Sequence, residues 1–101
     1  MANHKAHITI ADGRLSVHGV VDFASVVALR NAGEAWLKNE APNQCCIDLS
    51  QVSQCNSAAT TLLLCWLRSA EQLSKTVTIE SMPTALRSLL DLAGLDTLLT
   101  A

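Results

Sequence analysis

The stretch from Cys45 to Leu73 limits the fold more than any other part of this chain, because its apolar residues change period. The first part alternates between apolar and polar side chains, which predicts a strand with Cys45, Ile47 and Leu49 on one face. A polar segment from Ser53 to Ser57 follows and predicts a loop. After this loop the apolar residues recur about every 3.6 positions, the period of an amphipathic helix.

The predicted helix has two different faces. Its inner, apolar face comprises Ala59, Leu62, Leu63, Trp66, Ala70 and Leu73. Its outer face comprises Ser57, Thr60, Thr61, Leu64, Arg68 and Glu71. Asn56 and Ser57 are both suited to cap the helix, because a short side-chain oxygen accepts hydrogen bonds from the free N–H groups of the first turn.

The flanking segments predict three more strands and two more helices. We expect strands at residues 6–11, 14–20 and 76–80, with Ile8, Ile10, Leu15, Val17, Val77 and Ile79 pointing inward. Asp12-Gly13 predicts a type I′ hairpin turn between the first two strands. One helix is expected from a cap at Asp22 to about Lys38, and another from Pro83 to a stop at Gly94.

Two further features refine these elements. Gly33 lies on the inner face of the first helix, where it disfavours the helix by about 1 kcal/mol relative to Ala. We therefore expect the backbone at Gly33 to lie close to the sheet. The segment from Leu95 to Leu99 is a short apolar tail that we expect to pack back onto the domain.

The alternating strands indicate a sheet that is covered on one face and open to water on the other. A hairpin followed by strand–helix repeats predicts parallel pairing after the first two strands. The predicted fold is therefore a layered α/β fold, with a four-stranded mixed sheet and three main helices on one face. A length of 101 residues fits one domain, residues 1–101.

Composition excludes several functional classes. Seven basic and nine acidic residues are scattered, and only three residues are aromatic, which disfavours a nucleic-acid surface. The longest apolar run, Leu62 to Leu67, is far shorter than the roughly 20 residues of a membrane-spanning helix. The first ten residues, MANHKAHITI, contain no apolar segment typical of a signal peptide, so we expect a cytoplasmic protein.

No residue pattern predicts catalysis, a metal or a cofactor. His4, His7 and His18 form no recognisable nucleophile–base pair and are interpreted as solvated surface residues. Asp48 is expected to accept hydrogen bonds from loop N–H groups. The four cysteines lack C-x-x-C spacing, which favours free thiols over a zinc site or disulfides. The four glycines are scattered and form no phosphate-binding loop.

The sequence I-D-L-S-Q-V-S, followed by N-S-A-A at a helix start, resembles the signature of STAS domains. These are small domains of sulfate transporters and anti-sigma-factor antagonists. In the antagonists the corresponding pattern is Asp-Ser-Ser-Gly, whose second Ser is phosphorylated; that position here is Ala58. The STAS subunit of bacterial lipid-asymmetry (Mla) ABC transporters is more similar. Its pattern is Asp-Thr-Gly-Gly before a Leu-rich helix, and its Thr corresponds to Ser57.

This resemblance implies a non-catalytic subunit that binds the ATPase of an ABC-type phospholipid transporter and supports its assembly or activity. It implies a cytoplasmic location at the inner membrane, through that partner only. The expected partner-binding residues lie on the outer face of the central helix: Ser57, Thr60, Thr61, Leu64 and Arg68. The alternative is a phosphorylation-switched, antagonist-like regulator with Ser57 as its candidate phosphoacceptor. A third interpretation limits Ser57 to capping the helix.

Overall fold

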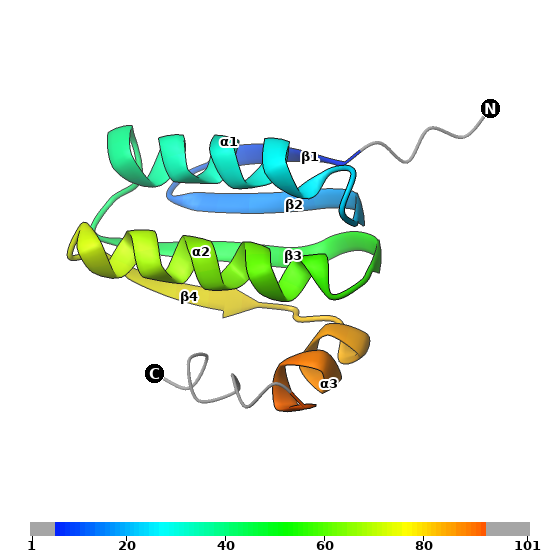
Figure 1. The fold of residues 1–101 in the computed structure, drawn as a ribbon. Coiled ribbons are helices and arrows are strands. Elements are labelled where there is room, and N and C mark those ends of the chain that lie inside the picture. The colour runs from blue at the N-terminus through cyan, green and yellow to red at the C-terminus, as the bar shows by residue number, and fades with distance from the viewer. Residues whose placement is uncertain (1–5, 93–101) are drawn as a thin grey trace.

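The computed structural model describes residues 6–92, and within this range the chain forms a mixed sheet and three helices (Figure 1). The strands are β1 (His7–Ala11), β2 (Arg14–Val21), β3 (Gln44–Cys55) and β4 (Thr76–Glu80). The helices are α1 (Val26–Asn39), α2 (Ala58–Gln72) and α3 (Thr84–Leu92). The strand order is β1-β2-β3-β4; β1 and β2 are antiparallel, and the other pairs are parallel.

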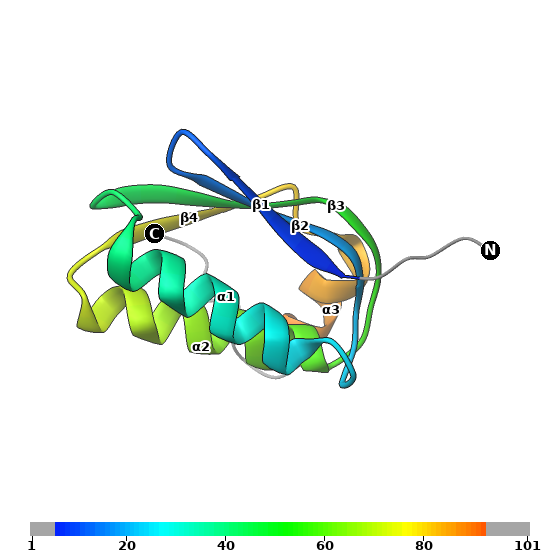
Figure 2. The same ribbon diagram turned by 90° about the horizontal axis from the view of Figure 1, so that it is seen from above.

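The helices lie on one side of the sheet, as the alternating strands predicted. Figure 2 shows α1 and α2 side by side against one face, with α3 at the end of the same layer. The opposite face carries no helix from the described part of the chain. The predicted four-stranded mixed sheet with helices on one face is therefore confirmed.

The hairpin between β1 and β2 turns at the predicted dipeptide. Both Asp12 and Gly13 have positive φ angles, of 52° and 75°. A two-residue hairpin with positive φ at both positions matches the right-handed twist of the strands it joins, and Asp-Gly is a favoured pair for it. Residues His7 to Ala11 consequently pair in register with His18 to Arg14.

The strand β3 is longer than predicted, and the polar segment from Ser53 to Ser57 is mostly not a loop. β3 continues to Cys55, which pairs with Val21 at the end of β2. Two register irregularities in the β2–β3 ladder place extra β3 residues opposite β2, as β-bulges do. The hydrogen bonds of a parallel neighbour thus hold polar residues in a strand, although their sequence resembles that of a loop.

The core lies between the sheet and the helical layer. Its largest fully buried side chains are Trp66, Leu15, Leu37, Ile47, Leu62, Leu63, Leu86 and Val17. Two predicted inward residues are exposed: Ile10 by 44% and Leu73 by 38%. Ile10 is on an edge strand whose hairpin end curves away from the helices (Figure 2), and Leu73 follows the last residue of α2. The predicted burial of both side chains was wrong, because the apolar period of a strand or helix does not show how far the neighbouring elements extend over it.

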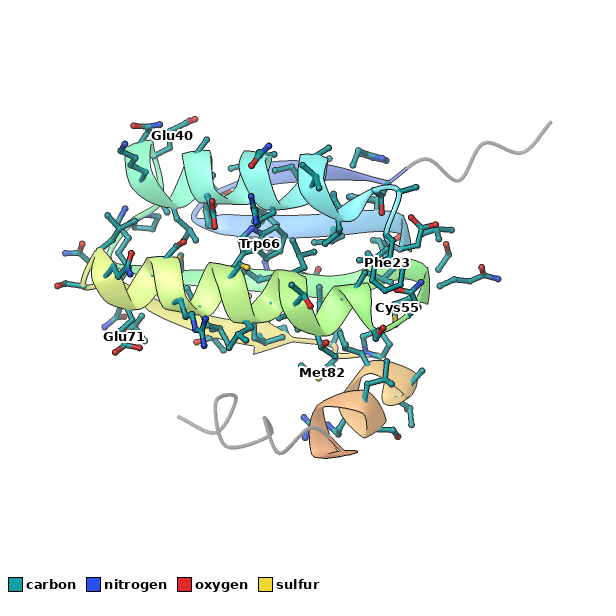
Figure 3. The ribbon with its side chains drawn as sticks, in the orientation of Figure 1. Phe23, Glu40, Cys55, Trp66, Glu71 and Met82 are labelled. Carbon is teal, nitrogen blue, oxygen red and sulfur yellow. The ribbon has the colours of Figure 1, made fainter. Side chains whose placement is uncertain are left out.

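Gly33 does permit a close approach, but the approaching group is a side chain of α2 and not the sheet. The indole of Trp66 fills the space beside Gly33, and its Nε1–H donates to the carbonyl of Arg30 at 3.2 Å. Figure 3 shows Trp66 between the two helices. The first helix therefore packs on the second through a position that has no side chain.

The boundaries of the first and last helices differ modestly from the predictions. Asp22 caps a turn that precedes α1, and the helix itself begins at Val26. Pro83 directly precedes α3, where its missing N–H removes no helical hydrogen bond. The predicted helix stop at Gly94, the tail from Leu95 to Leu99 and His4 lie outside the described residues.

Candidate functional site

The predicted partner-binding residues begin at the start of α2, where the helix is capped. Asn56 provides the cap: its Oδ1 accepts the backbone N–H of Ala58 at 2.8 Å. Ser57 occupies the first position before the helix, with φ −60° and ψ −18°, but makes no side-chain capping bond. The prediction that Ser57 caps the helix was therefore wrong, because the side-chain oxygen of Asn56 accepts the free N–H of Ala58 instead.

Loss of the capping role leaves the Ser57 hydroxyl at an exposed helix start. The backbone carbonyl of Ser57 is engaged, since Thr60 Oγ1 donates to it at 2.6 Å. This hydrogen bond turns the Thr60 hydroxyl back toward the chain. The exposed hydroxyls of the first turn are thus those of Ser57 and Thr61.

The five predicted partner-binding residues do share the outer face of α2. Ser57, Thr61 and Arg68 are exposed, and Thr60 and Leu64 are half-buried. Spacings of three and four residues place them in one row along the helix. We call Ser57, Thr60, Thr61, Leu64 and Arg68 the α2 row. It presents hydroxyl groups, one apolar side chain and one cation on the outer side of the helix.

Ala58, which the sequence resemblance aligns with the phosphorylated serine of the antagonists, faces the interior. Its exposed fraction is 1%, and it has no hydroxyl group. The neighbouring Ala59 is also buried, at 3%. A hydroxyl for phosphate transfer is therefore available only at Ser57 among these three positions.

Sequence reasoning assigned no role to Phe23, which the structure places in the turn between β2 and α1. It is 69% exposed, the largest value among the exposed large hydrophobic residues between positions 6 and 92. The signal was present in the sequence, since Phe23 directly follows the capping residue Asp22 and belongs to the apolar period of neither flanking element. Figure 3 shows Phe23 at the same end of the molecule as Cys55, the last residue of β3.

The open face of the sheet carries a small cluster of charges. Arg14 Nη1 lies 2.8 Å from Glu80 Oε1 and 3.6 Å from Asp48 Oδ2. Asp48 also accepts hydrogen bonds from the backbone N–H and the hydroxyl of Ser50. The Ser50 N–H is the main cause that lowers the pKa of Asp48. The predicted N–H acceptor role of Asp48 is confirmed, with its donor in the strand and not in a loop.

Cys45, Cys46, Cys55 and Cys65 are free thiols in the structure. Burial, and then the neighbouring Glu80 carboxylate, raise the pKa of Cys46 to about 11. Burial also raises the pKa values of Cys45 and Cys55. These environments suppress the thiolate, which is the form that attacks electrophiles and binds metals.

The residues between positions 6 and 92 contain no group of three or more potential metal ligands. The rings of His7 and His18 stack on the open sheet face, with centroids 4.6 Å apart and planes 6° apart. Thr9 Oγ1 lies 2.9 Å from His18 Nε2. His18 therefore has polar and ring partners on the neighbouring strand.

Two comparisons with known proteins match this chain. A family model described as "Mlab, STAS domain" matches residues 4–100. A search of curated proteins finds no match. The solved structures that match include an anti-sigma factor antagonist from Mycobacterium paratuberculosis, with a TM-score of 0.70 and 26% identity. That alignment covers 91% of this chain and 79% of the antagonist.

Two further similar structures are those of SpoIIAA, an anti-sigma factor antagonist. The unphosphorylated form has a TM-score of 0.72 and 15% identity, over 91% of this chain and 83% of that chain. The phosphorylated form of the Bacillus protein has a TM-score of 0.69 and 15% identity, over 91% and 86% of the two chains. At this identity the similarity shows a shared fold.

None of the three helices in the described range has both the length and the apolar composition needed to cross a membrane. The longest, α2, has 15 residues and exposes the polar side chains of the α2 row. The apolar side of α2 packs in the hydrophobic core of the domain.

Proposed function

The chain belongs to the Mlab-type STAS domain family, and on this premise we propose that it is a non-catalytic subunit that binds the ATPase of an ABC-type phospholipid transporter. In this role it supports assembly or activity of the transporter and helps maintain lipid asymmetry of the outer membrane. We infer that residues 1–101 are one STAS domain. The protein is then cytoplasmic and meets the inner membrane only through its partner.

The observation that carries this proposal is the composition of the α2 row. Its hydroxyl groups and Arg68 form a polar surface around Leu64, a combination typical of the polar rim and apolar centre of a protein interface. The inner side of the same helix is fixed in the core by Leu62, Leu63 and Trp66. A rigid helix presents the row without an ordering cost for its backbone, which favours affinity.

A second candidate function is that of an antagonist-like regulator switched by phosphorylation. Ser57 favours it, because its hydroxyl is exposed and makes no capping bond. A phosphate would also be stabilised at a helix N-terminus by the helix dipole. Ala58 argues against it, because the position that is phosphorylated in the antagonists has no hydroxyl here.

Intact-mass analysis separates these two functions. The chain is incubated with ATP and a cognate kinase of the anti-sigma type, and the mass of the whole protein is measured. The transporter-subunit function predicts an unmodified protein. Stoichiometric addition of one phosphate, mapped to Ser57 and lost in Ser57→Ala, would favour the regulator.

Co-purification with the transporter ATPase tests the proposed function directly. The ATPase of the phospholipid transporter from the same organism is co-expressed with the chain, and the mixture is separated by size exclusion. We expect a single complex that contains both proteins. Separate elution of the two folded proteins at micromolar concentration would contradict the proposal.

A further inference from the structure

Phe23 and Val27 form an exposed apolar patch at the start of α1. Their exposed fractions are 69% and 58%. The chain already follows a helical path from Asp22, whose carbonyl accepts the N–H groups of Ser25 and Val26. A spacing of four residues on this path places Phe23 and Val27 on the same side. In the described part of the chain, the other exposed large hydrophobic residues are Ile10 on β1 and Leu73 after α2.

The turn that carries Phe23 is held by hydrogen bonds of the Asp22 and Ser25 side chains, which flank Phe23 in the sequence. Asp22 Oδ1 accepts the N–H groups of Ala24 and Ser25, each at 3.0 Å. In return, the Ser25 hydroxyl accepts the N–H of Asp22 at 3.0 Å and lies 2.9 Å from the carbonyl of Val20, to which it can donate. This reciprocal pair fixes the backbone of the turn, so Phe23 is presented to solvent with little backbone freedom to lose on binding.

The turn that carries Phe23 lies beside the segment that leads into α2. Val21, two residues before Phe23, accepts the backbone N–H of Asn56 at 3.2 Å and pairs with Cys55. A hollow at this end of the sheet is lined by Val20, Val21, Asp22, Gln54, Cys55 and Asn56. In Figure 3, Phe23 and Cys55 lie at the end of the molecule where α2 begins. Asp22 and Asn56, the residues that directly precede Phe23 and Ser57, therefore both border this hollow.

We propose that Phe23, with Val27 beside it, is the apolar anchor of the surface that binds the transporter ATPase. This inference rests on the proposed function. The α2 row contains one apolar side chain, Leu64, which is half-buried, and no aromatic one. Interface centres are enriched in aromatic residues and depleted of charge, and a few such residues dominate the binding energy. Phe23 supplies this group and fits an apolar pocket on the ATPase.

The test compares Phe23→Ser with Leu73→Ser, a matched control. Both variants replace an exposed apolar residue by serine, but Leu73 lies at the opposite end of α2. The dissociation constant for the purified ATPase is measured by biolayer interferometry, alongside thermal unfolding of each variant. We expect Phe23→Ser to weaken binding at least about tenfold and Leu73→Ser to change it less than about twofold. Both variants should unfold at the wild-type temperature.

If Phe23→Ser does not fold, photo-crosslinking tests the contact between position 23 and the ATPase instead. p-Benzoylphenylalanine in place of Phe23 should crosslink to the ATPase, and the same group in place of Leu73 should not. Wild-type affinity of a folded Phe23→Ser variant, or equal crosslinking from both positions, would overturn the anchor. If Ser57→Arg still weakens the complex in that case, the proposed function stands without the anchor. If the wild-type chain does not bind the ATPase, the proposed function itself fails.

Discussion

The indole of Trp66 lies so close to Gly33 that a Cβ atom at position 33 would be 2.3 Å from its Cε2 and Nε1 atoms. Cβ atoms do not occur at such a distance, because it is far inside the van der Waals contact of two heavy atoms. The nearest group is the body of a buried ring and not the end of a flexible chain, since Trp66 is 0% exposed. Gly33 and Trp66 together set how closely α1 packs on α2.

We predict that Gly33→Ala destabilises the domain, although alanine favours a helix over glycine by about 1 kcal/mol. Overpacking against the indole should cost about 1–3 kcal/mol or more and reverse that gain. Urea unfolding of the variant measures the difference. The control is Gly33→Ala in a Trp66→Leu background, where the smaller side chain should restore the benefit of alanine. A stabilised Gly33→Ala single variant would contradict the observed packing.

Trp66→Ala should lower the free energy of unfolding by about 3–5 kcal/mol, as for other buried aromatic residues. The cost combines lost apolar burial with a cavity between the two helices. Trp66→Phe is the companion variant, because it retains much of the volume and removes the hydrogen bond to the Arg30 carbonyl. Denaturant titration that gives a loss below about 1 kcal/mol for Trp66→Ala would place this side chain outside the core.

Local patterns in the sequence predicted most of the fold, because the spacing of apolar residues within a strand or helix indicates which of its faces is buried. The alternation of Cys45, Ile47 and Leu49 predicted their burial correctly, and the period of α2 placed Leu62 and Trp66 in the core. Errors arose where a neighbour decides the outcome. β3 extends past its predicted end because β2 continues to pair with it, and Ile10 is exposed because β1 has one neighbour in the described sheet.

The candidate site was only partly predictable for the same reason. Helical spacing was sufficient to place the α2 row on one face. It could not decide whether Asn56 or Ser57 caps the helix, because both side chains have the required oxygen and the choice depends on the backbone path out of β3. The exposure of Phe23 also depends on tertiary structure, since the hydrogen bonds of Asp22 and Ser25 hold its turn at the surface.

The stability that Asp48 provides should depend on pH. Its pKa in the folded protein is lowered, chiefly by the Ser50 N–H and further by the Ser50 hydroxyl and Arg14. A lowered pKa means that the folded state favours the ionised carboxylate. This contribution is present above the unfolded value of about 3.9 and is lost as the pH falls through the lower folded value.

Acid titration of the wild type and Asp48→Asn measures this effect. The two proteins should differ in free energy of unfolding at pH 6, and the difference should close as the pH falls below about 4. Urea unfolding at each pH gives the comparison. A difference that stays constant down to the lowest pH at which both proteins fold would show that the Asp48 charge does not contribute.

Cys46 should react slowly with alkylating reagents. Its pKa of about 11 leaves little thiolate at pH 8. Iodoacetamide labelling, mapped by mass spectrometry, should be on the order of a hundredfold slower at Cys46 in the folded chain than in urea. Glu80→Gln should accelerate it, because the carboxylate raises this pKa. Rapid labelling of Cys46 in the folded wild type at pH 8 would contradict the assigned environment.

The measurement that tests the central claim most directly is the affinity of the ATPase for Ser57→Arg and for Gln72→Arg. Both variants add one positive charge to an exposed position on α2, Ser57→Arg at the start of the α2 row and Gln72→Arg at the last residue of the helix. Ser57 makes no capping bond that Ser57→Arg would remove. The helix dipole disfavours a cation at the helix start and favours one at the helix end, so we expect each variant to change the stability by no more than about 1 kcal/mol.

A charge that is buried in an interface without a partner costs several kcal/mol, so Ser57→Arg should weaken the complex by about a hundredfold or more. Gln72→Arg should bind within about twofold of the wild type. This pair of results, with both variants folded, is what a docking surface at the α2 row predicts. A folded Ser57→Arg that binds the ATPase with wild-type affinity would contradict it.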